Sequence, residues 1–492
     1  MKFNLKIFFS LFIVSIFFIH LNLPFVSFYC VVGLFFLFLS LFVISIFKRN
    51  DFLFFLKKII LKKNQPLILY CFFVVYVITI TIILSIQGIV NPISSLLEIF
   101  YRYILCMFLC YTTIAYLTYK HISLKTLIKI FYGILYLFLA LGVVDFIAYS
   151  LNIKPLTFLL EQTHNIETVV WGKEYHKAYA MGLPRVQSVY VEPGFFAENI
   201  FLFLPILYSF SLSKYKIFKN NYLNKLTKIT TIPLIWFNLI LTLSPIWLVG
   251  CIVSTLLYFI KPIFSFIKKY FIITTTSLII ISLSLAIIYR LNENQIRNSY
   301  LGRIIVVINN IKSIDNIILA EQSLGTRLSN VLNQIDIGMR SPIIGHGHSN
   351  KTILMVEQIK YNKSPVAITG EMIQYILHTE KVQFHSPPFV DIFVRYGLVG
   401  IFLYYGFILR TIFLLKKYKN CLNGIAFDFA SGLGASLLSY IVLTFYDIAS
   451  GELQSCMMLG ICIAIIYKLS FLLRIDVCDY FKNKGSNNVS NS

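Results

Sequence analysis

Charged residues are scarce in this sequence, and acidic residues are scarcer still. Asp, Glu, Lys and Arg make up 13% of the 492 residues, with 21 acids against 43 bases, whereas 58% of the residues are hydrophobic. A soluble protein cannot hide that much apolar surface, so a soluble globular fold is excluded. Apolar runs of about 20 residues are long enough to cross a bilayer as helices, and the composition therefore predicts a membrane protein.

Several motifs that define common enzymes are also absent. The sequence contains no Walker motif, no GxGxxG after a strand and no HExxH, so ATP-driven chemistry is not expected. No internal repeat recurs at a fixed period. None of the nine cysteines lies in either of the two long polar stretches, 152–193 and 292–388, so no disulfide framework is implied.

The apolar runs predict an all-α polytopic membrane protein with about twelve transmembrane helices. They are 5–21, 25–47, 67–90, 95–118, 124–150, 194–213, 229–243, 246–262, 270–290, 389–411, 424–446 and 453–473. The two short runs that flank Ser244-Pro245 predict either a hairpin of tilted spans or one broken helix, because proline kinks a helix. The first run resembles a signal peptide but lacks a small-residue cleavage site, so we expect a retained helix.

Lysine-rich loops alternate with loops in which acids nearly balance bases. Basic loops with few acids are expected in the cytoplasm, so the positive charge indicates membrane orientation rather than nucleic-acid binding. The basic residues are Lys48, Arg49, Lys57, Lys58, Lys62, Lys63, Lys120, Lys125, Lys129, Lys214, Lys216, Lys219, Lys225, Lys228, Lys261, Lys268, Lys269, Lys416, Lys417 and Lys419. Both long polar stretches then face outward, and both termini are cytoplasmic.

This orientation divides the chain into four parts. Residues 1–291 hold the first nine helices and the outward loop 152–193, and 292–388 form a large extracytoplasmic (periplasmic) loop. Residues 389–473 hold the last three helices, and 474–492 form a cytoplasmic tail. Within the large loop we expect an amphipathic surface helix at 297–320, another helix at 323–337, and turns at 341–348 because of their Pro and Gly.

Two arginines and one histidine in the outward loops could bind phosphate and exchange a proton. Arg185 and Arg327 present planar donor forks that match phosphate oxygens, so together they could clamp a lipid-linked diphosphate. Contact with lipid headgroups or a salt bridge within a loop is the alternative. His385 is expected at the outer membrane boundary and can exchange a proton near neutral pH, although a hydrogen-bonded interfacial histidine is the simpler explanation of the residue.

The carboxylates have competing explanations. Glu192 precedes Pro193, which is favoured at the first position of a helix, so Glu192 either stabilises that helix start or accepts a proton or a sugar hydroxyl. The acids within the apolar runs suit a polar cavity or a proton-relay transporter. These acids are Asp145, Glu198, Asp428 and Asp447. Asp391–Arg395 and Glu98–Arg102 each have a four-residue spacing, and we interpret both as ion pairs within one helix.

A pair of histidines alternates with glycines in the large loop. His346 and His348 could ligate a metal, but the remaining outward histidines show no ligand spacing. Gly345 and Gly347 more simply permit a tight turn.

Taken in order, these motifs resemble the O-antigen polymerase (Wzy) and O-antigen ligase superfamily. They are Arg-x-x-Ser and Glu-Pro-Gly at 185–194, Gly-Thr-Arg at 325–327, Pro-x-x-Gly-x-Gly at 342–347, and His-Ser followed by two spaced glycines at 385–400. The resemblance implies a GT-C-like helical membrane glycosyltransferase that needs no metal and no cofactor. It further implies a glycan donor on undecaprenyl diphosphate, an attack by an acceptor sugar hydroxyl, and inversion at the anomeric carbon.

The resemblance also assigns residues. Arg185 and Arg327 bind the diphosphate and stabilise the leaving group, His385 positions or deprotonates the acceptor, and Glu192 is the second candidate for the base. The expected substrate-binding residues are Ser188, Tyr190, Arg340, His346, His348 and Arg395. The chain departs from the family in having no Arg beside Ser244-Pro245 and in having Ser386 where Asn is common.

A polymerase of surface polysaccharide repeat units, of O-antigen or capsule type, is the function that we expect first. An O-antigen ligase that transfers the polymer to lipid A-core is the alternative within the same chemistry, and a flippase or transporter of lipid-linked oligosaccharide is a third. The expected partners are the lipid bilayer, the undecaprenyl-diphosphate-linked oligosaccharide, and a chain-length regulator and flippase of the same pathway, with no nucleic acid. The expected location is the bacterial inner membrane.

Overall fold

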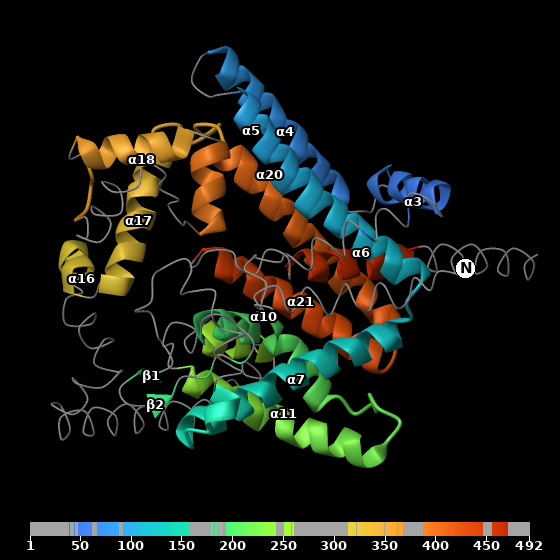
Figure 1. Ribbon diagram of the computed structural model, residues 1–492. Helices are drawn as coiled ribbons and strands as arrows, with labels where there is room; N and C mark the ends of the chain where they lie inside the picture. The colour runs from blue at the N-terminus through green and yellow to red at the C-terminus, as the bar shows by residue number, and fades with distance from the viewer. Residues whose placement is uncertain are drawn as a thin grey trace, which may run out of the picture.

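The structure is a computed structural model that describes a little over half of the chain. The described residues are 39, 44, 48–61, 66–87, 92–157, 179–180, 183–184, 186, 188, 193–242, 250–256, 258–259, 313–320, 322–348, 350–361, 363–367, 387–445 and 455–470. Within them the protein is almost entirely helical (Figure 1). The exception is an antiparallel pair of two-residue strands, in which Tyr179 is opposite Pro184 and Ala180 is opposite Leu183.

In chain order, the described elements are α3 (Arg49–Leu61), α4 (Leu67–Ile86), α5 (Pro92–Ile99), a π-helix η1 (Phe100–Phe108), α6 (Leu109–Lys120), α7 (Leu124–Ser150), β1 (Tyr179–Ala180), β2 (Leu183–Pro184), α10 (Pro193–Leu212), α11 (Asn221–Leu241), α16 (Ile314–Ala320), α17 (Gln322–Met339), α18 (Asn350–Lys360), α20 (Pro388–Tyr418), a 3-10 turn η2 (Lys419–Cys421) and α21 (Ile425–Thr444). They include helices in the apolar runs and others outside them, such as α3, α16, α17 and α18.

Five of the described helices are long and apolar enough to cross a membrane. They are Leu67–Ile86, Ile93–Lys120, Leu124–Ser150, Pro388–Cys421 and Ile425–Thr444, and two shorter apolar helices lie at Phe196–Leu212 and Ser455–Ser470. Seven of the expected spans coincide with these helices, which confirms the all-helical, membrane-type prediction for the described part of the chain.

Two predicted boundaries differ from the structure. The run expected at 229–243 belongs to α11, which begins at Asn221, where the Asn220 side chain accepts hydrogen bonds from the backbone of Tyr222 and Leu223. Its first two turns carry polar residues, so apolar pattern alone misses them. The run expected at 389–411 belongs to α20, which continues to Tyr418. Its last turn carries Lys416 and Lys417, so the apolar pattern ends before the helix does.

The helices pack in two groups that meet along α20 and α21. One group holds α4, η1 and α20, where Phe73 packs on Tyr404 and Tyr70 packs on Phe407, both with ring centroids 5.3 Å apart. The other group surrounds α10, whose residues from Phe196 to Phe210 are buried on every face. A helix that is apolar all round is expected at the centre of a bundle, so α10 forms the core of this group.

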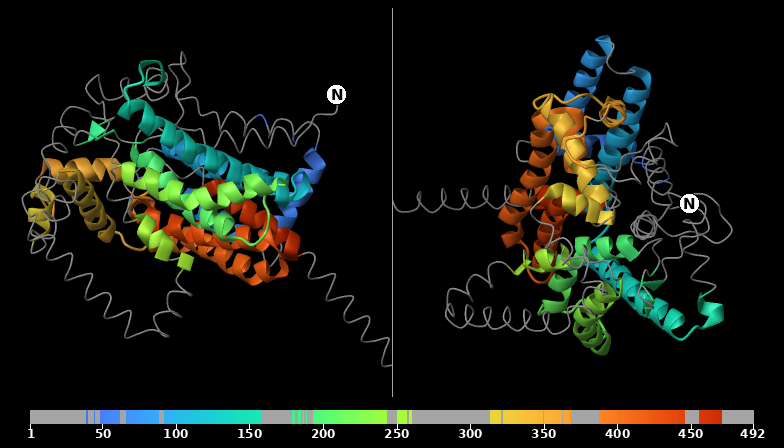
Figure 2. Two further views of the ribbon diagram at one scale, coloured as in Figure 1. Left: turned by 90° about the horizontal axis from the view of Figure 1, so that it is seen from below. Right: turned by 90° about the vertical axis from the view of Figure 1, so that its left-hand side faces the viewer.

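The lysine-rich segments and the polar segments lie at opposite ends of the bundle. The helices α16, α17 and α18 and the β1–β2 pair lie at the left in Figure 1 and again in the left panel of Figure 2. Helix α3 and the connections α6–α7, α10–α11 and α20–α21 lie at the other end in both views. The described parts of both polar stretches therefore share one end of the helices.

Candidate functional site

The Gly-Thr-Arg motif lies in the first turns of α17. The predicted helix at 323–337 is confirmed as α17, and the predicted turns at 341–348 are confirmed between α17 and α18. Gly325 lies where α16 and α17 approach closely, because a Cβ atom there would come within 2.0 Å of the Ile318 carbonyl oxygen. The glycine thus permits the contact that fixes α17 against α16.

Helix α20 is interrupted at Gly397, and the 341–348 turn lies against the interruption. Gly397 has φ 63° and ψ −164°, which a helix does not contain. The turn replaces the lost bonds: His346 and Gly347 donate to the carbonyls of Val394 and Arg395, both at 2.9 Å. Leu398 donates to the carbonyl of Pro342 at 2.8 Å. Backbone groups that the break frees are therefore satisfied by another segment.

Glycine is required on both sides of this contact. Gly345 has φ +76°, and a Cβ atom there would lie 2.4 Å from the Arg395 carbonyl carbon. A Cβ atom on Gly397 would lie 2.2 Å from the Ile343 carbonyl oxygen. Both positions combine a left-handed backbone with contact to backbone atoms that cannot move aside, so no other residue fits. The expected tight turn at Gly345 and Gly347 is confirmed.

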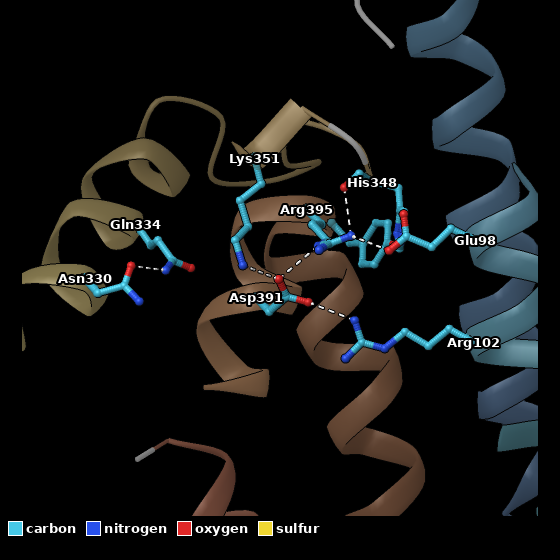
Figure 3. A network of polar contacts seen from close by, with 9 residues as sticks. Glu98, Arg102, Asn330, Gln334, His348, Lys351, Asp391 and Arg395 are labelled. Carbon is cyan, nitrogen blue, oxygen red and sulfur yellow. Dashed lines mark hydrogen bonds and ion pairs between the residues drawn. The ribbon is translucent and has the colours of Figure 1, made fainter. Parts of the chain in front are cut away.

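A network of charged side chains lies beside this contact, and we call it the Asp391 cluster (Figure 3). It consists of Glu98, Arg102, His348, Lys351, Asp391 and Arg395. Asp391 is its centre: Lys351 donates to Oδ1 at 2.6 Å, Arg395 donates to Oδ1 at 2.9 Å, and Arg102 donates to Oδ2 at 3.3 Å. Three cations from three separate elements thus share one buried carboxylate.

Glu98 and His348 form the second half of the cluster. The Nε2 atom of His348 lies 3.0 Å from Oε1 of Glu98, and Nη1 of Arg395 lies 3.9 Å from the same oxygen. Nδ1 of His348 shares a hydrogen bond with the hydroxyl of Tyr396, and Arg395 donates to the His348 carbonyl at 2.8 Å. A carboxylate only accepts, so the tautomer that suits the Glu98 contact has its proton on Nε2, and in that tautomer Nδ1 accepts from Tyr396.

Burial sets the charge states on α18 and its preceding turn. Desolvation lowers the pKa of His348 from its ordinary value, although Glu98 opposes the shift, so the imidazole is neutral near pH 7. Desolvation also lowers the pKa of Lys351 to about 8, against the attraction of Asp391. The cluster therefore holds three cations, Arg102, Lys351 and Arg395, against the two carboxylates of Glu98 and Asp391.

Of the two ion pairs predicted within single helices, the structure confirms one. Asp391 and Arg395 pair within α20. The predicted Glu98–Arg102 pair is replaced by contacts with other elements: Arg102 binds Asp391, and Glu98 lies against His348 and Arg395. The π-helix η1, which begins two residues after Glu98, carries Arg102. Its wider turn shifts the register of the side chains toward α20, and such turns are frequent at functional sites.

Of the predicted site residues that the structure describes, His348 and Arg395 lie in the Asp391 cluster, whereas Ser188, Arg327, Arg340 and His346 do not. Arg327 is exposed on α17, on the same helical face as the buried Asn330 and Gln334, whose amides bond to each other at 2.7 Å. Helix α17 packs against α20 further along, where Ile337 shares a buried apolar cluster with Val390 and Val394. Arg327 lies ten residues before this contact, toward the start of α17.

Arg340 and His346 have local partners. Arg340 is exposed and bonds to Asp336 at 2.7 Å, one turn earlier in α17. His346 is half-buried, and its Nε2 lies 2.8 Å from the Ile337 carbonyl, so it closes the end of α17. Both contacts stabilise the turn, and both residues remain predictions as substrate ligands.

Ser188 lies in a second polar contact, between α7 and α11. Its backbone N–H donates to Oδ2 of Asp145 at 3.1 Å, and its hydroxyl donates to the Phe138 carbonyl at 3.0 Å. Ser188 has φ 54°, a conformation uncommon outside glycine, and it is buried. Asp145, predicted only as an acid within an apolar run, therefore anchors the Arg-x-x-Ser segment to α7.

Four predicted site residues lie outside the described residues: Arg185, Tyr190, Glu192 and His385. Their roles stay predictions. The sequence did not lead us to predict Lys351 as a site residue, nor Asp391 as the centre of a charged cluster. A signal for Lys351 exists, because Lys351, Met355 and Gln358 recur at helical spacing and are the buried face of α18.

In the described part of the chain, no group of three His, Cys, Asp or Glu side chains is arranged so that it could hold a metal ion. Comparison with known proteins adds no assignment: no protein-family model matches the chain, and no curated protein matches it either. The fold and the site define an all-helical protein of membrane type with a charged cluster at the end of the bundle where its polar segments gather.

Proposed function

We propose that this protein is a membrane glycosyltransferase that polymerises the repeat units of a surface polysaccharide. The donor is a glycan on undecaprenyl diphosphate, the acceptor is a hydroxyl of a second glycan, and the anomeric configuration inverts. The enzyme needs no metal. We further propose a GT-C-like fold of about twelve spans in the bacterial inner membrane, with both termini in the cytoplasm and the reaction at the outer face.

The observation that carries this proposal is the gathering of three basic side chains around the buried carboxylate of Asp391. Among the described residues, these three cations face the carboxylates of Asp391 and Glu98, at the end of the bundle opposite the lysine-rich connections. Lysine-rich connections are typical of the cytoplasmic side, which favours an outward-facing cluster. A site of positive charge at the end of apolar helices suits a ligand with a diphosphate at headgroup level and a hydrocarbon chain in the bilayer.

Arg327 supplies the contact with the leaving group in this proposal. It is exposed on α17, which packs against α20 at Ile337, and a guanidinium can bond two phosphate oxygens at once. Departure of a lipid diphosphate builds negative charge on its oxygens, so a fixed cation lowers the barrier. Arg185 is the second predicted donor of such bonds, and Ser188, three residues later in the sequence, is anchored to Asp145.

Analysis of surface polysaccharide after deletion of the gene tests this function. Lipid A-core that carries a single repeat supports a polymerase, and the long-chain ladder returns with the intact gene. Bare core with accumulated lipid-linked polymer would instead identify a ligase. Single repeats trapped on the cytoplasmic face would identify a flippase, and an unchanged ladder would exclude all three.

A further inference from the structure

We propose that Glu98 is the catalytic base that takes the proton from the acceptor hydroxyl. This inference rests on the proposed function and names a residue that neither the motifs nor their resemblance assigns. Glu98 comes from the span Ile93–Lys120, far in sequence from both polar stretches. Its carboxylate differs from that of Asp391 in exposure and in partners.

The two carboxylates of the cluster have opposite surroundings. The Asp391 side chain is 7% exposed and accepts from three cations through both oxygens. The Glu98 side chain is 53% exposed, and its contacts with His348 and Arg395 both use Oε1. In the described part of the chain, no hydrogen bond or ion pair involves Oε2. Asp391 therefore organises the cations, whereas Glu98 presents one oxygen to a ligand.

The bound oxygen of Glu98 is held by groups that are themselves fixed. His348 bonds to Tyr396 through Nδ1, and Arg395 bonds to Asp391 and to the His348 carbonyl (Figure 3). A general base works best when one set of partners fixes its orientation and another atom remains open to the substrate. The arrangement around Glu98 has both features.

Glu98 also stands at the boundary between apolar and charged surface. Ile93, Leu97 and Tyr101 of the same span are exposed apolar side chains at helical spacing, as expected for a surface that faces lipid. Arg102 lies one turn beyond Glu98 and points toward Asp391 in Figure 3. A polyprenyl chain along the apolar stripe would bring its diphosphate to the cations and its first sugar beside Glu98.

In the proposed step, the acceptor oxygen forms a bond to the anomeric carbon while its proton passes to Oε2 of Glu98. The bond between the anomeric carbon and the phosphate oxygen breaks, and the electron pair leaves with undecaprenyl diphosphate. The charge on Glu98 is thus transferred to the leaving group, where the cations stabilise it. The proton on Glu98 then returns to solvent, to which the side chain is open.

The test uses the full-length protein in lipid nanodiscs and a lipid-linked repeat unit extracted from cells that lack the gene. Glu98→Gln keeps the shape and the acceptor oxygen near His348 but cannot take a proton. We expect its kcat to fall by about 100-fold or more, while the KM for the donor changes less than about threefold. Glu357→Gln, an exposed glutamate on α18 away from the cluster, is the matched control and should retain full turnover.

Two further measurements separate a base from a structural residue. Binding of undecaprenyl diphosphate should be equal for the wild type and for Glu98→Gln, which also reports correct folding. Sodium formate should restore part of the turnover of Glu98→Ala, because a small carboxylate can occupy the vacated position, and it should not stimulate the wild type. A structural role predicts no rescue.

Wild-type turnover in Glu98→Gln would overturn the inference, as would loss of undecaprenyl diphosphate binding in that variant or absence of formate rescue in Glu98→Ala. If the wild-type protein itself makes no polymer from the extracted repeat unit, the proposed function fails. The two failures are therefore distinguished by the wild-type reaction.

Discussion

The ammonium of Lys351 on α18 lies 2.6 Å from a carboxylate oxygen of Asp391 on α20, and both side chains are almost fully buried. This ion pair ties the outer helices to the break in a long apolar helix. Because Arg102 and Arg395 share the same carboxylate, the contact also links α18 to the η1 π-helix. Loss of either partner should therefore affect the whole end of the bundle.

The two partners of this pair should differ in their effect on stability. Asp391→Asn leaves three cations close together in a buried place, so we expect a loss of about 3–5 kcal/mol in the free energy of unfolding. Lys351→Met leaves Asp391 with two arginines, so we expect a smaller loss. Thermal denaturation of the purified protein in detergent measures both. A larger loss for Lys351→Met would show that the arginines do not compensate Asp391.

The contribution of Lys351 to stability should depend on pH. Burial lowers the pKa of Lys351 to about 8 in the folded protein, whereas an unfolded chain keeps the proton to about pH 10.4. Between these values the unfolded chain binds one more proton than the folded protein, so the contribution of Lys351 to the free energy of unfolding rises with pH in this window. Below pH 8 this contribution is at its lowest. The Tm of the wild type minus that of Lys351→Met should increase from pH 8 to pH 10. A difference that falls over this range would mean that the folded state favours the ammonium.

Arg327→Ala should abolish long-chain glycan while the protein stays in the membrane. Arg327 is exposed on α17, so its removal costs little packing and acts on ligand charge. His385→Ala should have the same effect if the predicted acceptor role holds. Gel ladders of surface polysaccharide together with immunoblots of membranes measure both. Lys360→Ala removes an exposed cation at the end of α18 and should leave the ladder intact; a wild-type ladder from Arg327→Ala would remove its assignment.

Gly397→Ala should detach the 341–348 turn from α20. The added Cβ would lie 2.2 Å from a backbone oxygen and would sit on a left-handed backbone, so the helix interruption or the turn must shift. We expect loss of polymer and faster proteolysis between α17 and α18. Gly406→Ala is the matched control on the same helix, because its nearest side-chain atom is 3.8 Å away. Alanine there should be neutral or stabilising by up to about 1 kcal/mol, and equal behaviour of the two variants would contradict the prediction.

The sidedness of the two ends can be measured with thiol reagents. Cys421 is free and exposed in the α20–α21 connection, which carries lysines and is expected in the cytoplasm. In a background without other cysteines, a membrane-impermeant maleimide should label Cys421 only after the membrane is opened. Tyr361→Cys, at the exposed end of α18, should be labelled in intact spheroplasts. Labelling of both sites from one side would exclude the proposed orientation.

Part of the candidate site was predictable because it depends on local rules. Pro193 does begin α10, and the glycines at 345 and 347 do take left-handed backbone angles, since proline and glycine act through their own φ preferences. The ion pair of Asp391 with Arg395 follows from a four-residue spacing in the same way. The contacts of Glu98, Arg102 and Lys351 were not predictable, because each partner lies on another element.

The sequence by itself determined the membrane-type helices and the start of α10, since apolar periodicity and capping residues act over a few turns. It also determined that the segment after α17 would be a turn. Only the tertiary structure decided that this turn fills the break at Gly397 and that Asp391 gathers Arg102 and Lys351. The physical reason is that burial makes an unpaired charge or backbone group costly, so the partner is whichever group the packing of distant helices brings within reach.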